Sequence, residues 1–401
     1  MKLPGPCIPR KVMYLSAGNF PSRAANTIQV AKMAAAYKRL LPSLEVVTLS
    51  GIRERPEHHS AEIQRWYGLG SDLPVRSLPF RPQQKSLFFD EEYRPPRWFY
   101  SAAAFYAKWQ GADLVFTRKA ETAYVTVRLG IDTILEIHIP PSMVPNEKIF
   151  SVLRNSSHLK ALVVVADSLR DQYLHLGFSE ETIVLEHDGV DLQQYHSLPE
   201  KREIRAKLGL PLTRNICIYT GHLYRDRGIE TLLEAARGLP EVQFLLVGGW
   251  ESDITWYRNL SDTMKLSNVS FLGFKKQSEI PLYQAAADVL VMQYSDKTAH
   301  ANRCSPLKLF EYMASGSPIV STDLSTLSGI LRHRENCLLT PPDSPEYLTS
   351  SILELLENRE LAQSLASSAK KTVEYFSWDA RACRVLDNAR ISVAWRNEVH
   401  S

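Results

Sequence analysis

Long hydrophobic runs, a strong excess of one charge and paired cysteines are all missing from this chain of 401 residues. Its longest apolar stretches, Ala161–Ala166 and the interrupted Trp98–Ala107, are far shorter than the roughly 20 residues that cross a bilayer. The net charge is only +3, and no run of Lys and Arg forms a basic arm. These absences argue against a membrane-spanning protein and against a nucleic-acid-binding protein.

Cysteine is also scarce. The five cysteines, an odd number, are Cys7, Cys217, Cys304, Cys337 and Cys383. They form no C-x-x-C pair, and no cysteine–histidine spacing fits a structural zinc site. This usage is typical of a reducing compartment. The first 30 residues lack the apolar core of a signal peptide, so we expect a cytoplasmic protein.

What the first half does contain is a regular alternation of short apolar runs and helical patterns. The predicted strands are Val12–Ser16, Leu44–Leu49, Asp113–Thr117, Thr133–Ile137 and Leu162–Ala166, and the predicted helices are Ala24–Leu40 and Pro96–Gln110. Residues 51–95 are rich in Pro, Arg and Gln, and we interpret them as a long irregular excursion. The alternation predicts an α/β domain with a mostly parallel sheet.

The same alternation restarts in the second half. The predicted strands are Ile216–Thr220, Val242–Val247, Val269–Leu272, Val289–Gln293 and Pro318–Ser321. The predicted helices are Ile229–Gly238, Ser278–Ala286 and Pro306–Ala314, followed by closing helices within 345–374 and 378–395. The sequence therefore predicts two α/β domains, joined within Gln193–Leu210.

Ligands of doubly wound sheets bind at the carboxyl ends of the strands, so the residues that follow each strand are informative. The first strand is followed by 17–22, Ala-Gly-Asn-Phe-Pro-Ser, which is not a G-x-G-x-x-G loop. The chain also has no Walker A motif. These two absences argue against a nicotinamide-dependent oxidoreductase.

The strongest local signal is a cationic helix start at 303–311. Ser305 is a good N-cap and Pro306 a good first helical residue, yet Lys308 stands where a capping box would have Glu. Together with Arg303 and the free backbone N–H groups, Lys308 indicates an anion site. Glu311 lies one turn further on, where its carboxylate could accept hydrogen bonds from sugar hydroxyls. The alternative is an exposed helix start with a solvated lysine.

A second cationic cluster follows the predicted strand Ile216–Thr220. The loop Gly221–Gly228 carries Arg225 and Arg227 just before a helix, which favours an anion site unless Asp226 merely neutralises an arginine. Two such cationic clusters in one domain fit a diphosphate.

In the first half, a strand ends at Pro140 and Pro141. By the period-two alternation of a strand, Glu136 and His138 share one face of it. His138 could donate a hydrogen bond or move a proton near neutral pH, and the alternative is a structural histidine.

These residues resemble the retaining glycosyltransferase family 4, which has the GT-B fold. The segments that carry the resemblance are Tyr219–Ile229, Phe244–Gly249, Val269–Phe274 and Ser305–Val320, with looser matches at Asn19–Val30, Glu136-x-His138 and His187–Asp191. The resemblance implies two Rossmann-like domains facing each other across a cleft. Residues 1–195 would bind the acceptor and 196–377 the nucleotide sugar, with the helix at 378–401 packing back on the first domain.

The resemblance also assigns roles to individual residues. Arg227 would grip the diphosphate, Glu311 would hold the ribose hydroxyls, and His138 would contact the transferred sugar. The expected catalytic residues are His138, Arg227 and Lys308. The expected donor-binding residues are Gly221, His222, Arg227, Gly248, Phe274, Arg303, Ser305, Leu307, Lys308 and Glu311. The expected acceptor-binding residues are Asn19, Arg23, Asn26 and Glu136.

Two positions depart from the family pattern. His222 stands where the family often has an arginine, and Arg303 stands where the first glutamate of the E-x7-E motif should be. That glutamate usually contacts hydroxyls of the donor sugar. Its replacement by Arg303 leaves the identity of the sugar open and is the best support for a non-catalytic binding protein.

The expected function is transfer of a sugar from a UDP- or GDP-linked donor to an acceptor hydroxyl, with retention, in glycan, glycolipid or polysaccharide synthesis. The alternatives are a nucleotide-sugar epimerase and a non-catalytic nucleotide-sugar-binding protein. No cofactor and no metal are expected, because no Asp-x-Asp pattern lies near the clusters. The expected partners are the nucleotide sugar and a glycan, lipid-linked or small-molecule acceptor.

The segment 94–109 mixes arginines with aromatic residues, and the first half has a small excess of basic residues. Both features are consistent with peripheral contact at the inner face of an anionic membrane. The favoured alternative is a helix packed on the core.

Overall fold

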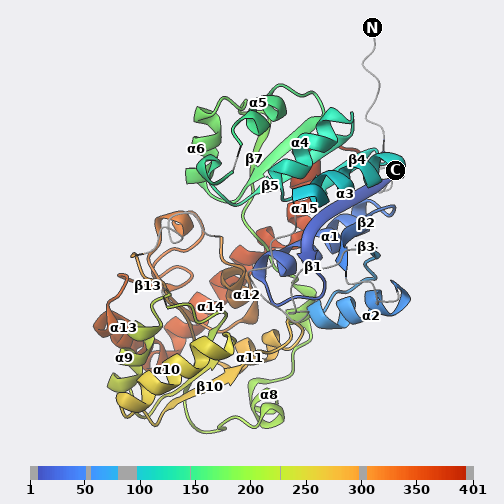
Figure 1. The fold of residues 1–401 in the computed structure, drawn as a ribbon. Coiled ribbons are helices and arrows are strands. Elements are labelled where there is room, and N and C mark those ends of the chain that lie inside the picture. Colours follow the sequence, from blue (N-terminus) through green and yellow to red (C-terminus); the bar gives the residue numbers. More distant parts are fainter. Residues whose placement is uncertain are drawn as a thin grey trace, which may run out of the picture. The chain divides into compact units, whose positions relative to one another are not determined.

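The computed structural model describes residues 8–50, 56–79, 97–144, 146–225, 227–297 and 305–393. The chain forms two compact units, Met1–Asp188 with Trp378–Ser401, and Gly189–Ser377. Each unit is an α/β domain built around its own parallel sheet (Figure 1). The prediction of two parallel-sheet α/β domains is therefore confirmed.

The sheet of the first unit has seven strands in the order β3-β2-β1-β4-β5-β6-β7, and each described pairing is parallel. The strands are β1 (Val12–Asn19), β2 (Glu45–Ser50), β3 (Val75–Pro79), β4 (Leu114–Thr117), β5 (Asp132–Ile137), β6 (Leu159–Val164) and β7 (Ile183–Leu185). The chain reverses its direction of winding between β1 and β4, which makes the carboxyl ends of these two strands a switch point of the sheet.

The helices of the first unit are α1 (Ala25–Leu40), α2 (Pro56–Tyr67), α3 (Arg97–Trp109), α4 (Ala120–Arg128), α5 (Lys148–Arg154), α6 (Asp167–His175) and α15 (Trp378–Asn388). The last of these, α15, is separated from the rest of the unit in sequence, yet it packs against α1 (Figure 1). Among the described residues, no helix is both long enough and apolar enough to cross a membrane.

The interpretation of 51–95 as irregular is wrong where the structure describes this segment. Helix α2 and strand β3 lie within it, and β3 extends the sheet by pairing with β2. Ile63 and Tyr67, one helical turn apart, are fully buried, and the Tyr67 hydroxyl donates to the backbone oxygen of Ser22 at 3.1 Å. The polar residues around these two anchors hid the helical period, because Ile63 and Tyr67 alone are buried among the described side chains of α2.

The sheet of the second unit has six strands in the order β10-β9-β8-β11-β12-β13. They are β8 (Ile216–Thr220), β9 (Gln243–Val247), β10 (Val269–Gly273), β11 (Val289–Met292), β12 (Ile319–Thr322) and β13 (Leu338–Thr340). The helices are α7 (Gln193–His196), α8 (Lys201–Leu208), α9 (Ile229–Gly238), α10 (Glu251–Thr263), α11 (Ile280–Ala286), α12 (Leu307–Ser315), α13 (Pro345–Glu357) and α14 (Arg359–Val373). Its switch point lies between β8 and β11.

The second unit begins at Gly189, a few residues before the expected boundary at 195. Val190 and Tyr195 are buried in the core of this unit together with residues of β8 and β11, such as Ile218 and Leu290. The Tyr195 hydroxyl donates to the Gln284 side chain at 2.6 Å. The segment that was expected to link the units is therefore already part of the second one.

Candidate functional site

At the carboxyl ends of β8 and β9, the backbones of two glycines lie in close contact. Gly221 and Gly248 have φ angles of +131° and +115°. The Gly221 N–H donates to the Val247 oxygen at 2.9 Å, and the Gly248 N–H donates to the Gly273 oxygen at 2.8 Å. A Cβ atom on Gly248 would stand only 2.4 Å from the Gly221 oxygen. No residue with a side chain fits at position 248 without moving this turn.

Lys308 reaches the same turn from the start of α12. Its Nζ lies 3.8 Å from the centre of the Tyr219 ring, and a Cβ on Gly221 would stand 3.1 Å from it. The expected capping pattern is shifted by one residue: Pro306, in extended conformation, is the N-cap, and the helix begins at Leu307. Ser305 precedes the cap in this arrangement, and Lys308 becomes the second helical residue.

Arg227 lies at this turn too. Its guanidinium carbon is 5.2 Å from the centre of the Tyr294 ring and 5.5 Å from that of Tyr224. Lys308 Nζ is 5.4 Å from the same Tyr294 ring. Tyr294 follows β11, so the two cations lie near the same aromatic ring at the switch point of the sheet. Two positive charges beside a helix N-terminus form a strongly anion-attracting surface.

Glu311 lies one turn after Lys308 on α12. One of its carboxylate oxygens accepts from the Gln277 amide, and the other accepts from Gln284 Nε2 at 3.1 Å. Gln277 belongs to the segment after β10 that begins with Phe274, so Glu311 is held beside that loop. Arg303 lies outside the described residues.

His222 occupies the position at which the family often has an arginine, and its ring is part of an aromatic stack. The ring centre lies 5.1 Å from that of Tyr224 and 5.5 Å from that of Trp250, with interplanar angles of 23° and 14°. The stack fixes the loop that carries Arg227. Trp250 and Tyr294 were not expected at the site from the sequence, although each follows a predicted strand.

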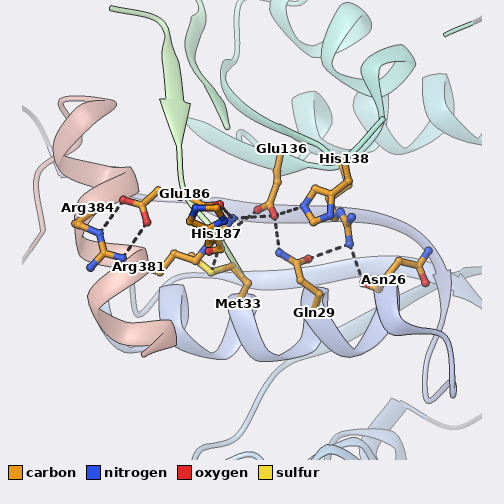
Figure 2. A network of polar contacts seen from close by, with 10 residues as sticks. Asn26, Gln29, Met33, Glu136, His138, Glu186, His187, Arg381 and Arg384 are labelled. Atoms are coloured by element: carbon orange, nitrogen blue, oxygen red, sulfur yellow. Dashed lines mark hydrogen bonds and ion pairs between the residues drawn. The ribbon is translucent and has the colours of Figure 1, made fainter. Parts of the chain in front are cut away.

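In the first unit, Glu136 lies on β5 and His138 directly after it, and their side chains meet on one face, as the period-two alternation predicts (Figure 2). His138 Nε2 lies 2.7 Å from Glu136 Oε1, and Gln29 Nε2 donates to the same oxygen at 2.6 Å. Glu136 is only 4% exposed. Its oxygens are enclosed by protein donors, and the expected contact of Glu136 with an acceptor stays a prediction.

The other expected acceptor residues lie where β1 meets α1. Asn26 is exposed at the start of α1, and its backbone oxygen accepts from Arg118 Nη1 at 3.3 Å. Arg23 is half-buried just before the helix. Asn19 ends β1, and its side chain lies outside the described residues.

Three charged residues of this network were not singled out from the sequence: Arg118 after β4, Asp188 after β7, and Arg381 on α15. Arg118 and Asp188 follow strands, where ligand-side residues are expected. Arg381 had a detectable signal. It interrupts the apolar stripe Trp378, Ala382, Val385, Leu386, in which all other positions are hydrophobic and buried. A charge at a core position of a helix indicates a buried partner.

The protonation states of the network follow from its charges. Burial alone would raise the pKa of Glu136, but Arg381, His138 and Arg118 together hold it well below its usual range. Burial lowers the pKa of His138, and Arg118 lowers it further, against the opposing effect of Glu136 and Asp188. Burial raises the pKa of Asp188. Near pH 7, the site therefore combines an ionised Glu136 with a neutral imidazole.

Glu136, His138 and Asp188 each offer an atom that could bind a metal ion, and these atoms lie within 4.8 Å of one another. The arrangement does not fit a cation. Arg381 donates to both oxygens of Glu136, at 3.0 and 3.2 Å, so an ion would have to bind beside a buried guanidinium. The expectation that no metal is required stays a prediction.

The known proteins to which the chain is similar are glycosyltransferases. Residues 200–372 match the family model "Glycosyl transferases group 1". A putative teichuronic acid biosynthesis glycosyltransferase of Bacillus subtilis is 25% identical over 270 residues, covering 66% of this chain and 63% of that protein. A lipopolysaccharide core biosynthesis glycosyltransferase of Rhizobium meliloti is 29% identical over 179 residues, covering 44% of this chain and 50% of that protein. The chain thus spans between half and two thirds of the length of these relatives.

Solved structures match over nearly the whole chain. The Anabaena protein HepE, solved in complex with UDP-glucose, has a TM-score of 0.71 at 16% identity, covering 94% of this chain and 98% of that one. Sucrose-phosphate synthase from Thermosynechococcus elongatus has a TM-score of 0.71 at 20% identity, covering 95% and 98%. This likeness shows the fold, which is the GT-B fold of two parallel-sheet α/β domains.

Proposed function

We propose that this chain, whose residues 200–372 match the glycosyl transferases group 1 model, transfers a glycosyl group from a UDP- or GDP-linked sugar to an acceptor hydroxyl with retention. The observation that carries the proposal is that Arg227 and Lys308 both lie close to the ring of Tyr294, at 5.2 and 5.4 Å from its centre, at the switch point of the second sheet. A nucleoside diphosphate sugar fits this arrangement. Its diphosphate would bind to the two cations, and its ribose hydroxyls would bind to the nearby carboxylate of Glu311. The products would belong to glycan, glycolipid or polysaccharide synthesis.

In the proposed reaction, the bond between the anomeric carbon and the diphosphate oxygen breaks, and a bond to the acceptor oxygen forms. The acceptor proton passes to the departing phosphate oxygen, and this proton transfer needs no protein base. The main task of the protein is to stabilise the charge that develops on the diphosphate. Lys308, Arg227 and the first N–H groups of α12 would do so.

A panel of UDP- and GDP-sugars tests this function. The purified protein is expected to release UDP or GDP slowly from one donor by hydrolysis, and EDTA is expected to leave the rate unchanged. An epimerase would convert the sugar without releasing a nucleoside diphosphate. Tight donor binding without turnover would instead identify a binding protein, and either result would reject the transferase.

We further propose that α3 brings the protein to the inner face of an anionic membrane. One face of α3 packs on the core through residues such as Phe99 and Ala103. Trp98, Phe105 and Trp109 are 54%, 58% and 79% exposed. Phe105 follows Trp98 by seven residues and Trp109 follows Phe105 by four, so the three side chains lie along one stripe of the helix. Aromatic side chains insert well at the bilayer interface.

Co-sedimentation with vesicles tests this contact. The protein is expected to pellet with phosphatidylglycerol vesicles and to be released by high salt. Serine in place of Phe105 and Trp109 is expected to abolish the binding. Serine in place of Tyr347, which is 61% exposed on α13, serves as the matched control and should leave the binding unchanged. Equal loss in both variants, or no binding at all, would exclude a specific contact through α3.

A further inference from the structure

Arg381 is a fully buried charge, and its guanidinium group is completely satisfied. Nε donates to the His187 oxygen at 2.7 Å, and Nη2 donates to the Glu186 oxygen at 3.2 Å. Nη1 lies 3.2 Å from Met33 Sδ. The two remaining hydrogen bonds go to the two carboxylate oxygens of Glu136. All five N–H groups therefore have an acceptor, and the guanidinium plane fixes the carboxylate plane.

The fixed carboxylate in turn determines which atom of His138 carries the proton. An ionised carboxylate only accepts hydrogen bonds, so the 2.7 Å contact requires a hydrogen on His138 Nε2. In a neutral imidazole, Nδ1 then carries the lone pair and is an acceptor. Gln29 is oriented in the same way, because its oxygen accepts from Arg118 at 3.1 Å and its amide nitrogen donates to Glu136 (Figure 2).

We propose that Arg381 is a positioning residue for the transfer reaction: acting through Glu136, it keeps His138 as the neutral Nε2–H tautomer and leaves Nδ1 to accept a hydrogen bond from a substrate hydroxyl. The proposal rests on the function proposed above. Arg381 itself touches no substrate. About a fifth of the His138 side chain, 20%, is exposed, whereas Arg381 and Glu136 are enclosed.

Four charged groups act on His138: Glu136 on β5, Arg118 after β4, Asp188 after β7 and, through Glu136, Arg381 on α15. If Arg381 is neutralised, the negative charge of Glu136 is no longer balanced. That charge then favours the imidazolium form, so the pKa of His138 must rise. A merely structural arginine would leave this titration unchanged in a variant that folds.

Helix α15 offers a matched control. Arg384, three residues after Arg381, makes a comparable two-pronged contact with Glu186, with Nε and Nη2 at 2.7 and 2.8 Å from the carboxylate oxygens. The printed distances join Arg384 to Glu186, whereas Arg381 is the arginine that contacts Glu136. Replacing Arg384 removes an arginine–carboxylate pair from the same helix and the same unit while leaving the Glu136–His138 contact in place (Figure 2).

The test is the ¹⁵N NMR titration of the His138 imidazole, assigned by its loss in His138→Gln. The wild type is expected to show a neutral Nε2–H tautomer at pH 7. In Arg381→Gln the pKa of His138 should rise by at least about one pH unit, and in Arg384→Gln it should stay as in the wild type. Should Arg381→Gln not fold, Arg381→Lys keeps the charge but loses the two-pronged geometry, and should shift the titration in the same direction by less.

Turnover is measured on the same proteins. In Arg381→Lys we expect kcat to fall about tenfold or more, with the KM for the donor little changed, because the donor diphosphate binds to the other unit. A His138 titration that Arg381→Gln or Arg381→Lys leaves unchanged, or that Arg384→Gln shifts equally, overturns the inference. The titration needs no substrate, so a response of His138 in a protein without transferase activity would reject the proposed function alone.

Discussion

Replacing Lys308 with alanine is expected to lower kcat/KM for the sugar donor by about 10²–10³-fold. Lys308 Nζ lies over Tyr219 and next to Gly221, at the switch point where the diphosphate is proposed to bind. The negative charge on the diphosphate grows as the glycosyl bond breaks, so the lysine stabilises the transition state more than the bound donor. The measurement is release of UDP or GDP at saturating and limiting donor concentrations.

Lys207→Ala is the control for this substitution. Lys207 is an exposed lysine on α8 in the same unit, and its loss should leave turnover and thermal stability unchanged. If Lys308→Ala turned over donor at the wild-type rate while remaining folded, the assignment of Lys308 to the diphosphate would be wrong. An equal loss of donor turnover in Lys308→Ala and Lys207→Ala would indicate a general effect of the protein's charge.

The second large effect is expected for Gly248→Ala. The new methyl group would stand 2.4 Å from the Gly221 oxygen, and the φ of +115° is unfavourable for alanine. We expect a backbone cost of about 1–2 kcal/mol and a further cost of about 1–3 kcal/mol from the overlap. The turn also carries Gly221 beside Lys308, so nucleotide affinity should fall about tenfold or more. Denaturant unfolding and calorimetric titration of UDP and GDP measure the two effects.

Gly209→Ala measures the free-energy cost of the positive φ alone, without the cost of steric overlap. Gly209 also has a positive φ, +66°, but no atom lies within 4 Å of a Cβ built there. This variant should lose stability only through the backbone term and should bind nucleotide as the wild type does. If Gly248→Ala were as stable as Gly209→Ala, the contact between the two glycine turns would not constrain the site.

The two sheets and the second-unit site were predictable from the sequence because both depend on local patterns. Buried parallel strands read as short apolar runs, and Lys308 and Arg227 each lie close to the start of a helix that follows a strand. Strand β3 and helix α2 were missed, because Ile63 and Tyr67 bury only a narrow stripe among polar residues. The shift of the cap from Ser305 to Pro306 involves a single residue, which local rules do not resolve.

The support for His138 could not be predicted, because it comes from contacts between distant parts of the chain. Arg381 and Glu136 are 245 residues apart in sequence, and Gln29 and Glu136 are 107 apart. Strand periodicity placed Glu136 and His138 on one face, but it gave no indication of which residues would enclose the carboxylate. The position of Arg381 within the apolar stripe of α15 indicates that it needs a buried partner, but the sequence does not identify which residue that partner is.

The most direct test of the central claim is calorimetric binding of UDP and GDP compared with UMP and GMP, in the wild type and in Lys308→Ala. If the cations at the switch point hold the diphosphate, the wild type should prefer one nucleoside diphosphate over its monophosphate by about tenfold or more. Lys308→Ala should lose most of that preference while binding the monophosphate as before. A wild type without the preference, or a variant that keeps it in full, would contradict the account.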